Sequence, residues 1–276
     1  MFVFLLISLL SFSSAFSDLW YEDTGIAENE LKTLFVKLNS SDHFSEQILI
    51  NDSIIEILAQ TLNNPTSFFY PFDSLNSVGI VTSADSLIRI YTWNISASLS
   101  EHKYFGFIQV RRAGRNEVTV IPLNHTPGIR NTEDHEEYTS DNWYGALYYQ
   151  VHPVEAGEST YYTLIGYDFN GVFTNVKMID VLQIHDNKAI LGAPVFMFKG
   201  DTKYRLIFRY SAQVVMFLRY VPELDMIVYD HLSPSAPRFE GQYRFYGPDM
   251  SHDALVFKDG KWMHKPDIEW KKPGGQ

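Results

Sequence analysis

The feature that most constrains the fold of this chain is a long succession of short, strand-like segments. From about residue 78 onward, runs rich in Val, Ile, Tyr, Phe and Thr alternate with turn residues at close spacing, which is typical of β-strands. Tight turns such as Asp168–Gly171 and Lys258–Lys261 join these runs, and connections this short favour antiparallel neighbours. The pattern therefore predicts about a dozen antiparallel strands in a meander.

This number of strands is too large for one open twisted sheet. A barrel, a sandwich and an irregular propeller-like sheet are the alternatives, and the lack of a clear sequence period counts against a regular propeller. Alternation over residues 204–210 separates Arg205 and Arg209 from the apolar face, so both arginines are expected away from the core. The predicted fold class is mainly β, within an α+β chain.

Two helices are predicted ahead of the strands, within residues 26–62. Apolar residues recur at helical spacing over 31–38, and a second apolar stripe runs from about His43 to Leu62, with Asp42 as the expected N-cap. Helices this short need a surface to cover. We therefore expect them to pack on the sheet that follows.

The N-terminus has the pattern of a secretory signal peptide. The apolar run from Phe2 to Leu10 is followed by small residues that suit signal peptidase, which would cut before Phe16 or Asp18. No Lys or Arg precedes the run, and a buried N-terminal strand is the alternative interpretation. The run is shorter than the roughly 20 residues that span a bilayer, so no integral membrane span is expected.

This interpretation divides the chain into a signal peptide over residues 1–17 and a single β-rich domain over residues 18–276. The long break at residues 124–142 leaves a subdivision of that domain open. Export places the mature protein in the periplasm or outside the cell. Because the chain has no cysteine, its stability must come from burial of a core rather than from disulfides.

The net charge of the chain limits the classes of partner that it is expected to bind. The 276-residue chain has a formal net charge of -11 and contains no basic stripe of any length. Nucleic-acid-binding proteins usually carry such a stripe, so we predict no nucleic-acid partner. The sequence also lacks the glycine-rich nucleotide loops, zincin motifs and nucleophile elbows that would fix a reaction, and no cofactor is expected.

Titratable residues nevertheless gather near the C-terminal strands, where a histidine beside a carboxylate could act as a general base. Adjacent residues of a strand point to opposite faces, so neighbours such as Asp230 and His231 are poorly placed to bond each other. A structural role for each residue is the alternative. The candidates for a catalytic site are Asp230, His231, Asp249, His252 and Asp253.

An acidic loop over residues 133–141 offers carboxylate oxygens of the kind that bind calcium. It lacks the glycine that calcium loops usually use for a tight turn, so a solvated acidic loop is the alternative. The candidates for metal ligands are Glu133, Asp134, Glu136, Glu137 and Asp141.

Aromatic residues cluster in one predicted strand, at Trp143, Tyr144 and Tyr148. Exposed aromatic side chains on a sheet can bind a glycan or a partner protein, because they give large contact area at small entropic cost. These three residues are therefore candidates for a binding face. Packing in the core and across strands is the alternative.

Part of the chain resembles uncharacterised exported proteins of Bacteroidetes bacteria. The longest matching segments are Met226–Pro234, Gly241–Asp249 and Asp253–Trp262. With shorter matches upstream, the resemblance covers roughly residues 80–264. The resemblance implies a bacterial envelope setting and supplies no catalytic residue. The leading hypothesis is an exported, non-enzymatic binding or structural protein of the cell envelope. An envelope or glycan hydrolase with an Asp/His site, and a calcium-stabilised β module, are the alternatives.

Overall fold

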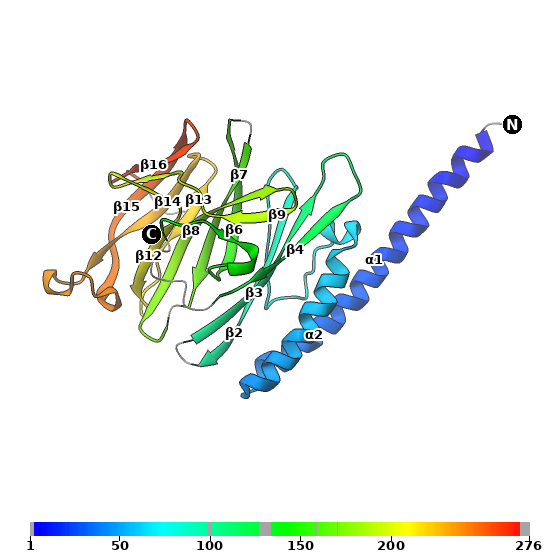
Figure 1. Cartoon of the computed structure of the whole chain (residues 1–276), viewed down its shortest axis with the longest axis horizontal. Helices are drawn as coiled ribbons and strands as arrows, with labels where there is room; N and C mark the ends of the chain where they lie inside the picture. The colour runs from blue at the N-terminus through cyan, green and yellow to red at the C-terminus, as the bar shows by residue number, and fades with distance from the viewer. Residues whose placement is uncertain (1–2, 99–100, 127–133, 158, 170, 271–276) are drawn as a thin grey trace.

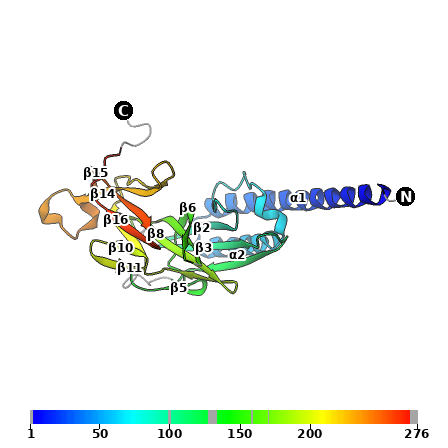
Figure 2. The ribbon, with the colours of Figure 1, turned by 90° about the horizontal axis from the view of Figure 1, so that it is seen from above.

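The computed structural model describes residues 3–98, 101–126, 134–157, 159–169 and 171–270, with the backbone alone described for residues 3–21. This part of the chain forms two helices followed by three sheets that stack on one another (Figures 1 and 2). The prediction of a mainly β fold with N-terminal helices packed on antiparallel sheets is confirmed. Each sheet has two edge strands in the described residues, so the arrangement is sandwich-like.

The helices lie side by side on one face of the first sheet (Figure 1). Helix α1 spans Val3–Ser40 and helix α2 spans Phe44–Leu62. Helix α1 begins well before the predicted residue 26, because the chain from residue 3 to residue 24 has no proline or glycine to interrupt it. The N-cap of α2 is His43 rather than Asp42, and it makes no side-chain capping bond. No helix in the described residues is both long and apolar enough to cross a membrane.

The first sheet is a meander whose two faces pack on different layers. Alternate residues of its second strand, such as Tyr91 and Trp93, face the helices, while Ile88 and Ile90 face the second sheet. The indole nitrogen of Trp93 donates a hydrogen bond to Asn51 of α2 at 2.7 Å. The strands, in spatial order, are β1 (Gly79–Thr82), β2 (Ile88–Ser98), β3 (Glu101–Arg111) and β4 (Val118–Asn124).

The second sheet is buried on both faces, because it lies between the first and third sheets. Residues 124–142, where a subdivision was left open, contain the passage from the first sheet to the second, and residues 127–133 lie outside the described residues. The strands in spatial order are β5 (Tyr138–Thr139), β9 (Lys188–Leu191), β8 (Thr174–His185), β7 (Ser159–Asp168) and β6 (Leu147–Ala156).

One edge of β8 is shared by two strands. Strand β12 (Leu206–Ser211) pairs with its first half and β9 with its second half. At the junction, the Arg205 guanidinium donates to Asp180 of β8 at 3.2 Å and to the carbonyl of Leu191 at 3.0 Å. Both charged side chains are fully buried. The expectation that Arg205 points away from the core is therefore wrong, because it precedes β12 and fills the gap between two strands.

The third sheet is antiparallel except that β10 and β16 pair in parallel. Between β14 and β15 the chain leaves the sheet over residues 235–245 and forms a projecting loop, the orange loop at the edge of Figure 1. The strands in spatial order are β11 (Asp201–Lys203), β10 (Phe196–Phe198), β16 (Lys261–Lys265), β15 (Tyr246–Lys258), β14 (Met226–Pro234) and β13 (Leu218–Val221).

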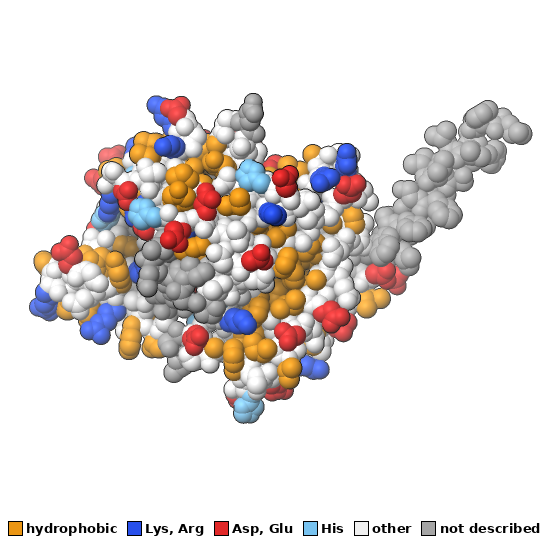
Figure 3. Space-filling view, viewed as in Figure 1, with side chains coloured by type: hydrophobic (Ala, Val, Ile, Leu, Met, Phe, Trp, Pro, Cys, Tyr) orange, Lys and Arg blue, Asp and Glu red, His pale blue; other side chains and the backbone are white. Residues whose placement is uncertain are grey.

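On the face of the molecule seen in Figure 3, Lys and Arg side chains lie scattered among Asp and Glu side chains. The described part of this face therefore shows charges of both signs rather than a continuous basic stripe. A candidate site lies among the strands of the third sheet and β12.

Candidate functional site

The pairing of β14 with β15 decides which of the C-terminal candidate residues meet. Tyr229 lies opposite Asp253, and Asp230 lies opposite His252. Because consecutive residues alternate between faces, these two pairs point to opposite sides of the sheet. The pairing then becomes irregular between Asp230 and Leu232, which places His231 at a β-bulge where a side chain can be redirected.

On one side of the sheet, the Asp253 carboxylate is surrounded by donors. Its Oδ2 atom lies 3.0 Å from His231 Nδ1 and 3.3 Å from His264 Nε2, while Oδ1 accepts a 3.0 Å hydrogen bond from the Asp267 amide. Burial raises the pKa of Asp253, but these hydrogen bonds outweigh burial and hold the pKa below its ordinary value. The carboxylate is therefore ionised at neutral pH and fixes the orientation of the His231 ring.

On the other side, Asp230 accepts a 2.7 Å hydrogen bond from the Phe217 amide, and His252 Nε2 lies 3.8 Å from Asp230 Oδ1. The ring of His252 packs against Trp270, with centroids 5.3 Å apart. These contacts tie the C-terminal segment to the sheet. They separate Asp230 and His252 from the His231–Asp253 pair.

Asp249 belongs to a third group. It accepts a 2.6 Å hydrogen bond from the Ser233 hydroxyl and a 2.7 Å hydrogen bond from the Ser251 hydroxyl. Burial raises the pKa of Asp249, and the serine hydrogen bonds lower it further than burial raises it, so the pKa lies below its ordinary value. The structure thus brings His231 and Asp253 together and leaves the remaining candidates in two separate groups.

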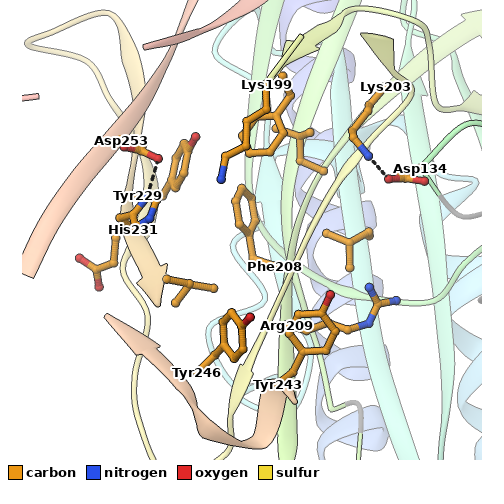
Figure 4. A pocket seen from close by; sticks show the side chains of 15 residues that line it. Asp134, Lys199, Lys203, Phe208, Arg209, Tyr229, His231, Tyr243, Tyr246 and Asp253 are labelled. Atoms are coloured by element: carbon orange, nitrogen blue, oxygen red, sulfur yellow. Dashed lines mark hydrogen bonds and ion pairs between the residues drawn. The ribbon is translucent and has the colours of Figure 1, made fainter. Parts of the chain in front are cut away.

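The His231–Asp253 pair forms part of the wall of a cavity of about 170 Å³ between β10, β12 and β14 (Figure 4). Asp230 also borders this cavity. Near the opposite wall, the ammonium group of Lys203 pairs with Asp134. The rest of the wall is largely aromatic, and its rings belong to Phe198, Phe208, Tyr229, Tyr243 and Tyr246.

The buried phenol of Tyr229 is the most unusual group of this wall. The residue is 2% exposed, and its hydroxyl has no hydrogen-bond partner. Burial, reinforced by the nearby charge of Asp253, raises the pKa of Tyr229 far above its ordinary value. The hydroxyl is therefore neutral and has a proton to donate. Its ring packs against Phe208, with centroids 4.9 Å apart.

Lys199 reaches the cavity from the turn between β10 and β11. Lys199 and Gly200 both have positive φ, at 50° and 85°, as the two central residues of a type I′ hairpin turn do. No ion pair joins the Lys199 ammonium to a carboxylate within the described residues. Figure 4 shows the side chain extending toward the space between the rings of Tyr229 and Phe208.

Four residues of the cavity wall were not predicted from the sequence: Lys199, Tyr229, Tyr243 of the projecting loop and Tyr246 at the start of β15. The sequence does contain a hint at Lys199, because a lysine occupies a turn position where Asn or Asp is preferred. No sequence pattern marks Tyr229, since its free hydroxyl depends on the neighbours that surround it in space.

The candidate metal ligands do not gather. Glu133 lies outside the described residues, Asp134 pairs with Lys203, and Asp141 accepts a 3.3 Å hydrogen bond from Asn124. Glu136 and Glu137 are exposed. Over the described residues, no group of three or more His, Cys, Asp or Glu side chains is placed to hold a metal ion.

The candidate aromatic binding residues are buried between the first and second sheets. Trp143, Tyr144 and Tyr148 are 0%, 2% and 1% exposed. The Trp143 indole donates to the Tyr148 hydroxyl at 3.0 Å, and the Tyr144 hydroxyl donates to Asp168 at 3.4 Å. The expectation of an exposed aromatic face at these residues is therefore wrong, because the first sheet covers the face of the second sheet on which they lie.

Compared with protein-family models, with curated proteins and with solved structures, the chain matches nothing.

Proposed function

We propose that this chain is an exported, non-enzymatic protein of the bacterial cell envelope that binds a small ligand in the cavity between β10, β12 and β14. The observation that carries the proposal is Tyr229, which lines the cavity and whose buried hydroxyl lacks a hydrogen-bond partner. A buried polar group left without a partner costs about 1–3 kcal/mol. A ligand with an acceptor atom at this position removes that cost.

The shape and lining of the cavity support binding of a ring-shaped molecule. Aromatic side chains line it on several sides, and ligand sites typically combine such apolar walls with a few placed polar groups. The site is also held firmly, since Asp253 is fixed by three hydrogen bonds. The export part of the proposal is supported by the N-terminal apolar run and by the resemblance to exported proteins of Bacteroidetes.

The test is a ligand screen by thermal shift, with mono- and disaccharides and single-ring acids, on the wild-type chain and on Tyr229→Phe. A ligand that binds the folded state raises the melting midpoint. We expect a hit whose affinity falls about tenfold in Tyr229→Phe, in line with loss of one buried hydrogen bond. Tyr220→Phe, which removes an exposed hydroxyl bonded to Asp225, is the control. A hit that binds both variants equally well, or no hit at all, would contradict the proposal.

A hydrolase is the second candidate, favoured by one specific observation, the contact of His231 with an ionised, buried aspartate on a cavity wall. Such a pair orients a histidine for general-base catalysis. Within the described residues, however, no serine or threonine hydroxyl bonds to His231, so the base would have to activate water. Turnover of chromogenic glycosides or esters that disappears in His231→Ala would establish this activity and replace the binding proposal.

A further inference from the structure

The charged groups around the cavity differ in whether the protein supplies an ion-pair or hydrogen-bond partner for them. Asp253 receives hydrogen bonds from His231, His264 and the Asp267 amide. Lys203 is paired with Asp134, and the Asp230 carboxylate is bonded to a backbone amide on the other side of the sheet. Lys199 is different, because its ammonium group has no carboxylate partner within the described residues.

Two donors without acceptors therefore border one small space. One is the Lys199 ammonium group, and the other is the Tyr229 hydroxyl. Lys199 is an exposed residue whose ammonium group lies 5.5 Å from the centroid of the Phe198 ring, whereas the Tyr229 hydroxyl is buried. An ionic hydrogen bond that forms at the buried end of the cavity is stronger than one in bulk water. A carboxylate suits this pair, because one oxygen can accept from the ammonium group and the other from the phenol.

The size of the cavity limits what can accompany the carboxylate. The volume is about 170 Å³, and an apolar cavity of about 150 Å³ in another protein holds one benzene molecule. The walls contributed by Phe208 and Tyr246 offer ring faces and edges for such a group. A single six-membered ring is therefore the largest body that the enclosed part of the cavity admits.

We infer that the ligand is a single-ring carboxylate whose ring lies among the aromatic residues and whose carboxylate lies between Lys199 and Tyr229. This inference rests on the proposed function and gives it a ligand class. The site should bind the carboxylate more tightly than a neutral amide of the same shape, since the amide offers one acceptor oxygen and no charge for Lys199.

The experiment measures binding of two matched pairs, benzoate with benzamide and cyclohexanecarboxylate with its amide, by ligand-observed NMR titration. For the wild-type chain we expect at least one carboxylate to bind ten or more times more tightly than its amide. Lys199→Met should reduce this preference to about twofold or less, because the charge that selects the anion is gone. Tyr229→Phe should weaken carboxylate binding about tenfold. Lys188→Met, which removes an exposed lysine at the start of β9, is the matched control and should retain the full preference.

The outcomes separate the inference from the function on which it rests. If an amide binds as tightly as its acid and Tyr229→Phe weakens both, the cavity is a binding site and the carboxylate inference fails. If the preference for the acid survives in Lys199→Met, the anion binds elsewhere and the inference also fails. If none of the four compounds binds to the wild-type chain, the inference is overturned, and the wider screen described above still decides whether the cavity binds another class of ligand.

Discussion

Asp253 is the residue whose surroundings give the clearest pH dependence. Its pKa is lowered in the folded protein by hydrogen bonds that outweigh burial, so the ionised form stabilises the fold at pH values above the unfolded-state pKa of about 4. This contribution is lost as the pH falls below about 4 toward the folded-state pKa. Asp253→Asn should therefore lower the free energy of unfolding by about 2 kcal/mol at pH 7 and by much less at pH 3.

Urea denaturation at pH 7, 5 and 3 measures this effect. Asp259→Asn is the control, because Asp259 is an exposed turn residue at which asparagine is equally suitable. A difference between wild type and Asp253→Asn that stays constant over this pH range would show that the hydrogen bonds to Asp253 do not depend on its charge.

The contacts of single residues were the feature that the sequence predicted least well. The sequence does show that Asp253 and His231 belong to strands that end near each other. Their contact depends on the register of β14 with β15, on the irregularity after Asp230 and on β16, which supplies His264. None of these can be read from the alternation of polar and apolar residues, because alternation fixes the face of a residue and not its neighbour across the strand.

At the scale of the elements, the buried pair of Arg205 and Asp180 holds together the point where β9 and β12 share one edge of β8. Replacement of one partner leaves the other charge buried and uncompensated. We therefore expect Arg205→Met to lower the free energy of unfolding by about 3–5 kcal/mol, measured by chemical denaturation.

The double variant Arg205→Met with Asp180→Leu should recover much of that loss, because no isolated charge remains. The exposed pair of Arg112 and Glu117, 3.8 Å apart, is the control, and Arg112→Met should cost less than about 1 kcal/mol. Equal effects of Arg205→Met and Arg112→Met would contradict a role of burial at the strand junction.

The elements themselves were predictable to different degrees. The stripe of α2 and the turns of the C-terminal strands follow from spacing and turn residues, since both depend on local chemistry. The early start of α1 and the burial of Trp143 were not foreseen. Trp143 is buried because the first sheet packs on its face of the second sheet, and the residues of β2, β3 and β4 that cover it are distant from it in sequence, so no local pattern near Trp143 could reveal its burial.

For the whole molecule, the layered arrangement predicts that a substitution in one layer destabilises that layer more than the others. Leu58 of α2 is fully buried against the first sheet, and Leu58→Ala should remove about 2–5 kcal/mol of packing energy. Hydrogen exchange should then become faster in α1 and α2 and remain slow in β14 and β15, because these strands belong to a separate core.

Leu49→Ala is the matched control within the same helix, since Leu49 is 70% exposed. This change should leave exchange rates in all layers close to those of the wild type. Faster exchange in every layer of Leu58→Ala would show that the three cores unfold as one cooperative unit.

The order of the layers in space follows their order along the chain, from the helices through the first and second sheets to the third, except that β12 joins the second sheet after β10 and β11. A chain that emerges with its N-terminus first, from a ribosome or through a translocation pore, can thus fold vectorially, each layer settling on the one already formed. The third sheet is a second exception, because its last strand, β16, lies in the middle, between β10 and β15. The contact of His264 with Asp253 at the cavity wall consequently forms only after β16 has been synthesised. A nascent chain that stops before β16 therefore lacks this support of the wall.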